Sequence, residues 1–192
     1  MTEVDIQIRP SDLVCHNVLA MAETNRSLDL DKVVRHFKNA EYDDTKFNCV
    51  RVRLWKYRCT VAIFNSGKLQ VTGAPSPEDS HSALLFVAYR LKQLFGPTII
   101  FSNYRVDNVL ATFDIGSKMD LHALSRDPAL TVTYMPSQFA AAVVREVSTS
   151  VVIDVFSSGK MNVKGKGNLE RICQGMNKVM PQIVKHLCED LI

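Results

Sequence analysis

Hydrophobic and polar residues alternate in two stretches of this chain, residues 61–73 and 151–165. Each stretch runs into the tripeptide Ser-Gly-Lys and leaves it in a second alternating segment. Alternation with a period of two predicts strands with one buried face, and a short Gly-containing turn between two such runs predicts a β-hairpin. Gly67 and Gly159 can supply the positive φ that such a turn needs. The sequence therefore predicts the same hairpin twice.

The two copies keep a constant spacing. Phe47 and Phe139 lie 92 residues apart, and so do Phe64 and Phe156. Each copy predicts a strand, a short helix, several strands and a long helix. This order is typical of an α+β fold with helices on one face of an antiparallel sheet. We expect one pseudo-symmetric body made of an internal repeat.

The predicted elements follow the repeat. Copy one has a strand at 13–24, a short helix from Asp29 or Asp31, strands over 46–72, and a helix over 78–95 that Ser76 can cap. Copy two has a strand at 102–113, a short helix at 120–124, strands over 131–164, and a helix over 168–188 that Pro181 should kink. We expect an arm at 1–12 that is flexible or paired at a sheet edge, repeat 1 at 13–98 and repeat 2 at 99–192.

The strands have two different faces. The core face carries aliphatic residues: Val50, Val52, Leu54, Val61, Ile63, Leu69 and Val71 in copy one, and Val144, Val151, Ile153, Val155, Met161 and Val163 in copy two. The opposite face mixes cations, small residues and Phe: Phe47, Cys49, Arg51, Arg53, Ala62, Phe64, Ser66, Lys68, Gln70 and Thr72, then Phe139, Ala141, Val143, Arg145, Val152, Asp154, Phe156, Ser158, Lys160, Asn162 and Lys164.

This second face suggests a ligand. Burying so many cations without partners is costly, and apolar side chains among cations suit nucleic acid. The alternative is that the Phe residues are buried under a helix or at a dimer seam.

Composition narrows the function classes. The 192 residues are 46% hydrophobic, the net charge is +3, and the five cysteines form no CxxC motif. No signal peptide, membrane-length apolar run, metal-ligand spacing, P-loop or nucleophile motif is present. We expect an intracellular protein with free thiols in a reducing compartment, no cofactor and no enzymatic activity.

One set of residues resembles a known family over residues 13–188. Its members in this chain are Asn17, Ala40-Glu41-Tyr42, Phe47, IFNSGK with TG after it, Asn108 in VDNVLA, Tyr134, Phe139, VFSSGK and Pro181. This order resembles the core of the TATA-box-binding protein family, which includes TBP-related factors. The resemblance implies a pseudo-twofold saddle whose concave ten-stranded antiparallel sheet sits on the DNA minor groove, with the helices on its convex face. It also implies a nuclear transcription initiation factor that binds and bends promoter DNA.

The resemblance also assigns roles. Phe47, Phe64, Phe139 and Phe156 match the side chains that wedge between base steps in the family. Asn17 and Asn108 match amides that meet minor-groove acceptors, and Thr72 matches a residue that reads the groove floor. The copy-two equivalent of Thr72 is Lys164, so that symmetric contact is lost. The other residues expected at DNA are Arg51, Arg53, Ser66, Lys68, Gln70, Arg145, Asp154, Ser158, Lys160 and Asn162.

Several residues depart from the family. Ala62, Gln70, Asp154 and Asn162 stand where it has small aliphatics, so the DNA-facing sheet is more polar. Asp154 either pairs with Arg145 or a neighbouring Lys, or takes part in specificity. If it faces the groove, the half-site under copy two should tolerate G·C pairs, because the guanine amino group can donate to a carboxylate.

Partner surfaces are implied as well. Glu41 and Tyr42 lie near the family's surface for transcription factor IIA. The segment before Phe139, with Pro136 and Gln138, replaces glutamates that meet transcription factor IIB in the family. In helix 81–95 we expect some of Leu85, Phe86, Tyr89 and Phe95 to be exposed and to serve a protein partner or self-association. The alternative function is a scaffold of the same fold with weak or non-TATA DNA binding.

Overall fold

The computed structural model describes residues 6–45 and 47–188, and the side chain of Phe47 lies outside the described part. The chain forms two compact units. The continuous unit holds residues 16–108. The discontinuous unit joins the described residues up to Cys15 to those from Val109 onwards. The predicted α+β class is confirmed in each unit.

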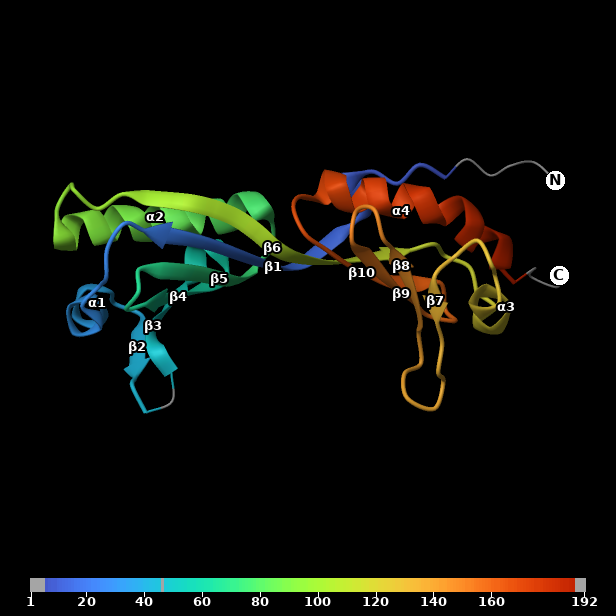
Figure 1. The fold of residues 1–192 in the computed structure, drawn as a ribbon, viewed down its shortest axis with the longest axis horizontal. Helices are drawn as coiled ribbons and strands as arrows, with labels where there is room; N and C mark the ends of the chain where they lie inside the picture. Colours follow the sequence, from blue (N-terminus) through green and yellow to red (C-terminus); the bar gives the residue numbers. More distant parts are fainter. Residues whose placement is uncertain (1–5, 46, 189–192) are drawn as a thin grey trace. The chain divides into compact units, whose positions relative to one another are not determined.

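The continuous unit contains an antiparallel sheet in the order β2-β3-β4-β5-β1. Its elements are β1 (Val14–Thr24), α1 (Leu30–His36), β2 (Ala40–Asp43), β3 (Phe47–Leu54), a 3₁₀ turn η2 (Trp55–Tyr57), β4 (Cys59–Phe64), β5 (Lys68–Ala74) and α2 (Pro77–Phe95). Helix α2 lies across one face of these strands (Figure 1). The predicted core face is buried against it.

The discontinuous unit repeats this plan with the order β6-β10-β9-β8-β7. Its elements are η1 (Pro10–Asp12), the end of β6 (Phe101–Asp114), α3 (Leu121–Ser125), β7 (Val132–Thr133), β8 (Ala142–Glu146), β9 (Val151–Val155), β10 (Lys160–Gly165), α4 (Leu169–Ile183) and η3 (Val184–His186). Helix α4 packs on the strands in the way that α2 does (Figure 1). Each unit thus has one face covered by a helix, and we call the opposite one its open face.

Side-chain caps fix where the helices begin. Asp29 accepts a hydrogen bond from the backbone of Lys32 at the start of α1, and Ser76 accepts one from Asp79 at the start of α2. Such caps satisfy N–H groups that have no partner within the helix. The predicted cap Ser76 is confirmed, and of the two candidates predicted for α1, Asp29 and Asp31, the cap is Asp29.

Helix α4 is shorter than predicted. It ends at Ile183 instead of continuing to 188, and η3 follows it. Pro181 lies in its last turn. Proline has no backbone N–H to donate, so one helical hydrogen bond is missing in the turn where α4 gives way to η3.

The described part of the arm differs from the expectation, while residues 1–5 lie outside the described part. Ile8 is buried, with only 3% exposed, and Asn177 of α4 binds its backbone, so it is not paired at a sheet edge. The Ile8 N–H donates to Asn177 Oδ1 at 2.8 Å, and the Asn177 Nδ2 group donates to the Ile8 carbonyl at 3.0 Å. One side-chain amide therefore satisfies both backbone groups of an extended segment on the helix.

Candidate nucleic-acid interface

Cross-strand pairs build the open face of the continuous unit. Thr60 lies opposite Thr72, and Ala62 lies opposite Gln70. All four side chains are half-buried, which suits a surface of small groups between exposed edges. Phe64 ends β4 beside the hairpin turn and is also half-buried. Its position at the strand end is the one predicted.

The two hairpin turns have the same geometry. Gly67 and Gly159 both have φ +89°, and the hydroxyls of Ser66 and Ser158 accept from the backbone N–H two residues on, each at 3.4 Å. Those next residues are Lys68, which is half-buried, and Lys160, which is exposed. Each turn is thus preceded by a Phe, at the end of β4 or directly after β9, and followed by a Lys that begins the next strand.

Two phenylalanine rings meet in the discontinuous unit. The centroids of Phe139 and Phe156 are 6.1 Å apart, and the rings are inclined by 73°. Phe139 is 45% exposed, although a phenyl ring is normally buried. The pair occupies the end of the open face, and it corresponds by the repeat to Phe47 and Phe64.

Several cations of the continuous unit form ion pairs with acidic residues. Arg51 pairs with Glu41 across β3 and β2 at 3.6 Å. Arg105 lies 3.8 Å from Glu23 and 3.0 Å from Asp107. Neither Arg105 nor Glu23 is among the residues predicted at the site. The alternating pattern of β1 places Glu23 on the open face and could have revealed it.

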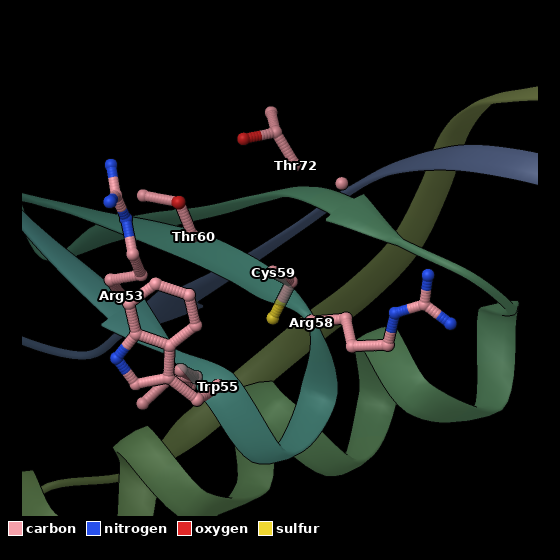
Figure 2. A pocket seen from close by; sticks show the side chains of 8 residues that line it. Arg53, Trp55, Arg58, Cys59, Thr60 and Thr72 are labelled. Atoms are coloured by element: carbon pink, nitrogen blue, oxygen red, sulfur yellow. The ribbon is translucent and has the colours of Figure 1, made fainter.

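Arg53 is placed differently from Arg51. Its guanidinium carbon lies 5.6 Å from the centroid of the Trp55 ring. Arg53, Thr60 and Thr72 project to the side away from α2 (Figure 2). Arg53 is exposed and available to an anion on that side.

Asp154 is a correction to the predicted exposed face. Only 3% of it is exposed, and its carboxylate accepts a hydrogen bond from Lys164 Nζ at 2.5 Å. Asp154 lies directly opposite Asn162 on β10, so Lys164 reaches it diagonally, from two residues further along the strand. The predicted pairing with a neighbouring Lys is confirmed, and Arg145, exposed on β8, is not the partner that the structure records. Cys49 and Ala141, also predicted on this face, are buried.

The two asparagines that resemble groove-reading residues are half-buried. Asn17 Oδ1 accepts from the Gly73 N–H at 2.7 Å, which leaves the Nδ2 amide to carry its donor function. Asn108 belongs to β6 and ends the continuous unit.

The predicted partner residues are partly accessible. Glu41 is exposed and Tyr42 half-buried in β2, and Pro136 and Gln138 are exposed in the loop before Phe139. On α2, Leu85 is 49% and Tyr89 61% exposed, as predicted for that helix. Phe86 is half-buried against Tyr57, with ring centroids 6.2 Å apart, and Phe95 is half-buried under the Arg26 guanidinium.

Other site classes find no support in the part of the chain that the structure describes. Within residues 6–45 and 47–188, no group of three or more His, Cys, Asp or Glu side chains is arranged to hold a metal ion. Among these residues, no helix has the length and apolar character needed to cross a membrane.

The fold and the open faces define a class: an α+β protein of two like halves, each with a helix-backed antiparallel sheet and a Phe beside a Ser-Gly-Lys turn. Known proteins share this plan. The family model "Transcription factor TFIID (or TATA-binding protein, TBP)" matches residues 12–94 and again 103–186. The chain belongs to the TATA-binding protein family, and the resemblance seen in the sequence is confirmed.

Individual relatives agree. The TATA-box-binding protein-like 1 of Entamoeba histolytica is 31% identical over 176 residues, which cover 92% of this chain and 79% of the relative. The TATA-box-binding protein of Tetrahymena thermophila is 31% identical over 163 residues, covering 85% of this chain and 66% of the relative. The solved Methanococcus jannaschii TBP matches with a TM-score of 0.74 and 27% identity, over 91% of this chain and 99% of that chain.

Proposed function

We propose that this protein binds double-stranded promoter DNA through the minor groove with its open faces, bends it, and recruits transcription initiation factors in the nucleus. The observation that carries the proposal is the exposed Phe139 ring against Phe156, beside a turn that presents Lys160. Inserting such rings between base steps removes them from water and opens a kink, while nearby cations hold the phosphates.

Residues of both open faces have roles in this proposal. Phe64 and Phe156, with Phe47 and Phe139, act as the wedges. Lys68, Lys160, Arg53 and Arg145 contact phosphates, helped by the hydroxyls of Ser66 and Ser158. Asn17, Asn108, Thr72, Gln70 and Asn162 face base edges, where the minor groove offers adenine N3 and thymine O2 as acceptors.

Partner surfaces complete the proposal. A factor resembling transcription factor IIA docks at Glu41 and Tyr42. A factor resembling transcription factor IIB docks at the loop that holds Pro136 and Gln138. Glu41, Pro136 and Gln138 are exposed and Tyr42 is half-buried, and Glu41 and Tyr42 belong to β2, the last strand at its end of the strand order.

The salt bridges favour a second candidate. Arg51, Arg105 and Lys164 each have a carboxylate partner, and a paired cation releases fewer counterions from DNA than a free one. A TBP-related scaffold with weak or non-TATA DNA binding would have such a face. The salt dependence of DNA binding separates the two candidates.

A gel shift with TATA-containing and random duplexes at two salt concentrations tests the first proposal. Each phosphate contact contributes a slope of about −0.9 to log K against log salt. We expect Lys160→Ala to reduce the slope by about one such contact. A duplex affinity that is negligible at low salt would favour the scaffold.

Bending is tested by fluorescence transfer between dyes on the two ends of a duplex. We expect Phe64→Ala and Phe156→Ala, alone and together, to reduce transfer more than they reduce stability. Phe95→Ala is the matched control, because Phe95 is a half-buried Phe at the end of α2 and lies off the sheet. The wedge role is wrong if the double variant bends DNA as the parent does.

Helix α2 carries an exposed pair of large side chains, Leu85 and Tyr89. Leu85 and Tyr89 are four residues apart and therefore lie on one side of the helix. We propose that this pair meets a protein partner or a second copy of the chain. Sedimentation velocity at increasing concentration tests the second copy: a monomer at every concentration would exclude it.

A further inference from the structure

The turn that follows β3 has a counterpart in copy two, and the two differ in chemistry. Residues 55–58 read Trp-Lys-Tyr-Arg, whereas residues 147–150 read Val-Ser-Thr-Ser. Their backbones agree at the one strained position: Arg58 has φ +50° and Ser150 has φ +60°. The two turns thus share a left-handed residue at the same position, although residues 55–57 form a 3₁₀ turn and residues 147–149 do not.

The copy-two turn is closed from within. The Glu146 carboxylate accepts hydrogen bonds from the backbone and hydroxyl groups of Ser148 and Thr149. These bonds, those from Ser148 first, lower the pKa of Glu146 to about 2. Leu54 takes the place of Glu146 in copy one and has no group that could accept them. The copy-one turn is therefore not closed by hydrogen bonds of this kind.

Copy one presents its aromatic residues to solvent. Trp55 is 69% exposed, and leaving so large an indole in water forgoes a substantial hydrophobic gain. Lys56 Nζ lies 5.4 Å from the centroid of the Tyr57 ring, and the Arg53 guanidinium lies over Trp55. Exposed aromatic rings beside cations are the composition of binding hot spots.

Three hollows adjoin this turn, and Arg53 and Leu54 line all of them. The first, of about 370 Å³, continues along Thr60 and Thr72 (Figure 2). The second, of about 300 Å³, lies between Trp55, Tyr57 and Phe86. The third, of about 200 Å³, reaches the helix side at Phe37, Phe86 and Arg90. Because these hollows share lining residues, we treat them as one surface, the Trp55 groove, whose lining runs from Thr60 and Thr72 of the strands to Phe86 and Arg90 of α2.

The Trp55 groove is positively charged. Cations from four segments line it: Lys38, Arg53, Lys56, Arg58 and Arg90. No Asp or Glu among the described residues lines any of the three hollows. Apolar floors of this size hold one bulky side chain each, and the surrounding charge selects acidic neighbours for it.

We propose that the Trp55 groove binds an acidic peptide segment of a partner protein that inserts bulky apolar side chains beside Trp55 and Phe86. The path of the groove favours a peptide over nucleic acid. A duplex held on the open face cannot follow a surface whose lining runs to the helix side, whereas a flexible chain can. This site shares Arg53 and Thr72 with the proposed DNA contacts and extends beyond them.

The single Trp of the sequence is the reporter. The probe is a short fluorescein-labelled peptide of Asp and Glu with two Phe residues, titrated into the full chain. We expect saturable anisotropy and a blue shift of the Trp55 emission. The same peptide with Ser in place of Phe should bind about tenfold or more weakly, because the apolar anchors carry the affinity.

The repeat provides the matched variant. Replacing residues 55–58 by the copy-two residues (W55V/K56S/Y57T/R58S) removes the aromatic and basic side chains and places at position 58 the residue type that adopts the same positive φ in copy two. Leu54 cannot accept the hydrogen bonds that Glu146 accepts in copy two, so the folding of this variant is checked directly. We expect it to lose peptide binding by about tenfold or more while it still binds duplex DNA, and we expect Val147→Ala to change neither. Circular dichroism confirms that both variants are folded.

Several results would overturn the proposal. Equal binding by the exchanged variant, or by the peptide without Phe, would reduce the groove to non-specific electrostatics. Displacement of the peptide by duplex DNA, with quenching of Trp55 by the duplex alone, would assign the groove to nucleic acid. A concentration-dependent Trp55 shift without peptide, with dimers in sedimentation, would assign it to a second copy of the chain.

Discussion

Lys164 Nζ lies 2.5 Å from a carboxylate oxygen of Asp154, diagonally across β10 and β9. The Asp154 side chain is 4% and the Lys164 side chain 43% exposed. The carboxylate has therefore left water almost completely, while the ammonium is still partly hydrated. An anion in this position depends on its cation.

We expect Lys164→Ala to lower the free energy of unfolding by about 1 to 3 kcal/mol, because it leaves the buried carboxylate without its donor. The double variant D154N/K164A should recover part of that loss, since a neutral amide tolerates burial better than an unpaired carboxylate. Urea denaturation followed by circular dichroism measures both. Lys160→Ala, an exposed Lys on the same strand, is the control, and a loss as large as that of Lys164→Ala would show that the pair is unimportant.

The same pair bears on site selection. We predict that the half-site under copy two tolerates or prefers G·C pairs, because Asp154, Asn162 and Lys164 replace groups suited to an A·T groove floor. For Asp154 to accept from a guanine amino group, Lys164 must first swing to a phosphate. Asp154→Leu should shift preference toward A·T by about 1 to 3 kcal/mol. Selection from random duplexes checks this, and recovery of a uniform A·T element by the unmutated protein would contradict it.

Acid should loosen the copy-two turn. The pKa of Glu146 is about 2 in the folded chain against an ordinary 4.5, so its contribution to stability is present above about pH 4.5 and is lost as pH falls toward 2. We expect Glu146→Gln to lower stability at neutral pH and to flatten the pH dependence in that window. Urea midpoints from pH 2 to 6 give the comparison. An unchanged slope in the variant would mean that other carboxylates govern the acid limb.

Substitutions at two glycines distinguish the cost of backbone strain from the cost of a steric clash. Gly159 and Gly116 both have positive φ, +89° and +76°. A Cβ at Gly159 would collide with the Ser117 carbonyl oxygen, whereas at Gly116 nothing lies within 4 Å. We expect Gly116→Ala to cost about 1 kcal/mol from strain alone and Gly159→Ala about 1 to 3 kcal/mol more. Thermal unfolding measures the difference, and equal losses would mean that the loop at Ser117 yields freely.

Local patterns predicted most of the fold. Every residue that the alternation assigned to the core face of the two sheets is buried. Asp29 and Ser76 were among the predicted caps because of their position before amphipathic runs. These features depend on neighbours in sequence, so the sequence suffices. The internal repeat then made each prediction in one copy a check on the other.

The failures involve contacts between distant residues. Asp154 is buried because a long side chain from another strand reaches it, and Ile8 is held because a helix far along the chain offers an amide. Neither contact leaves a periodic trace. Trp55 was missed as a site residue for a different reason: it stands where the strand pattern stops, and only the structure shows the hollows beside it.

The hydrogen bonds between Ile8 and Asn177 connect positions 169 residues apart. During synthesis, residues 16–108 form a continuous segment that can acquire its native contacts as soon as it leaves the ribosome. The segment around Ile8 has been made earlier still, yet its binding site on α4 does not exist until nearly the whole chain has been translated. The segment around Ile8 therefore reaches its native position late, and we expect it to stay open to chaperones and proteases until then.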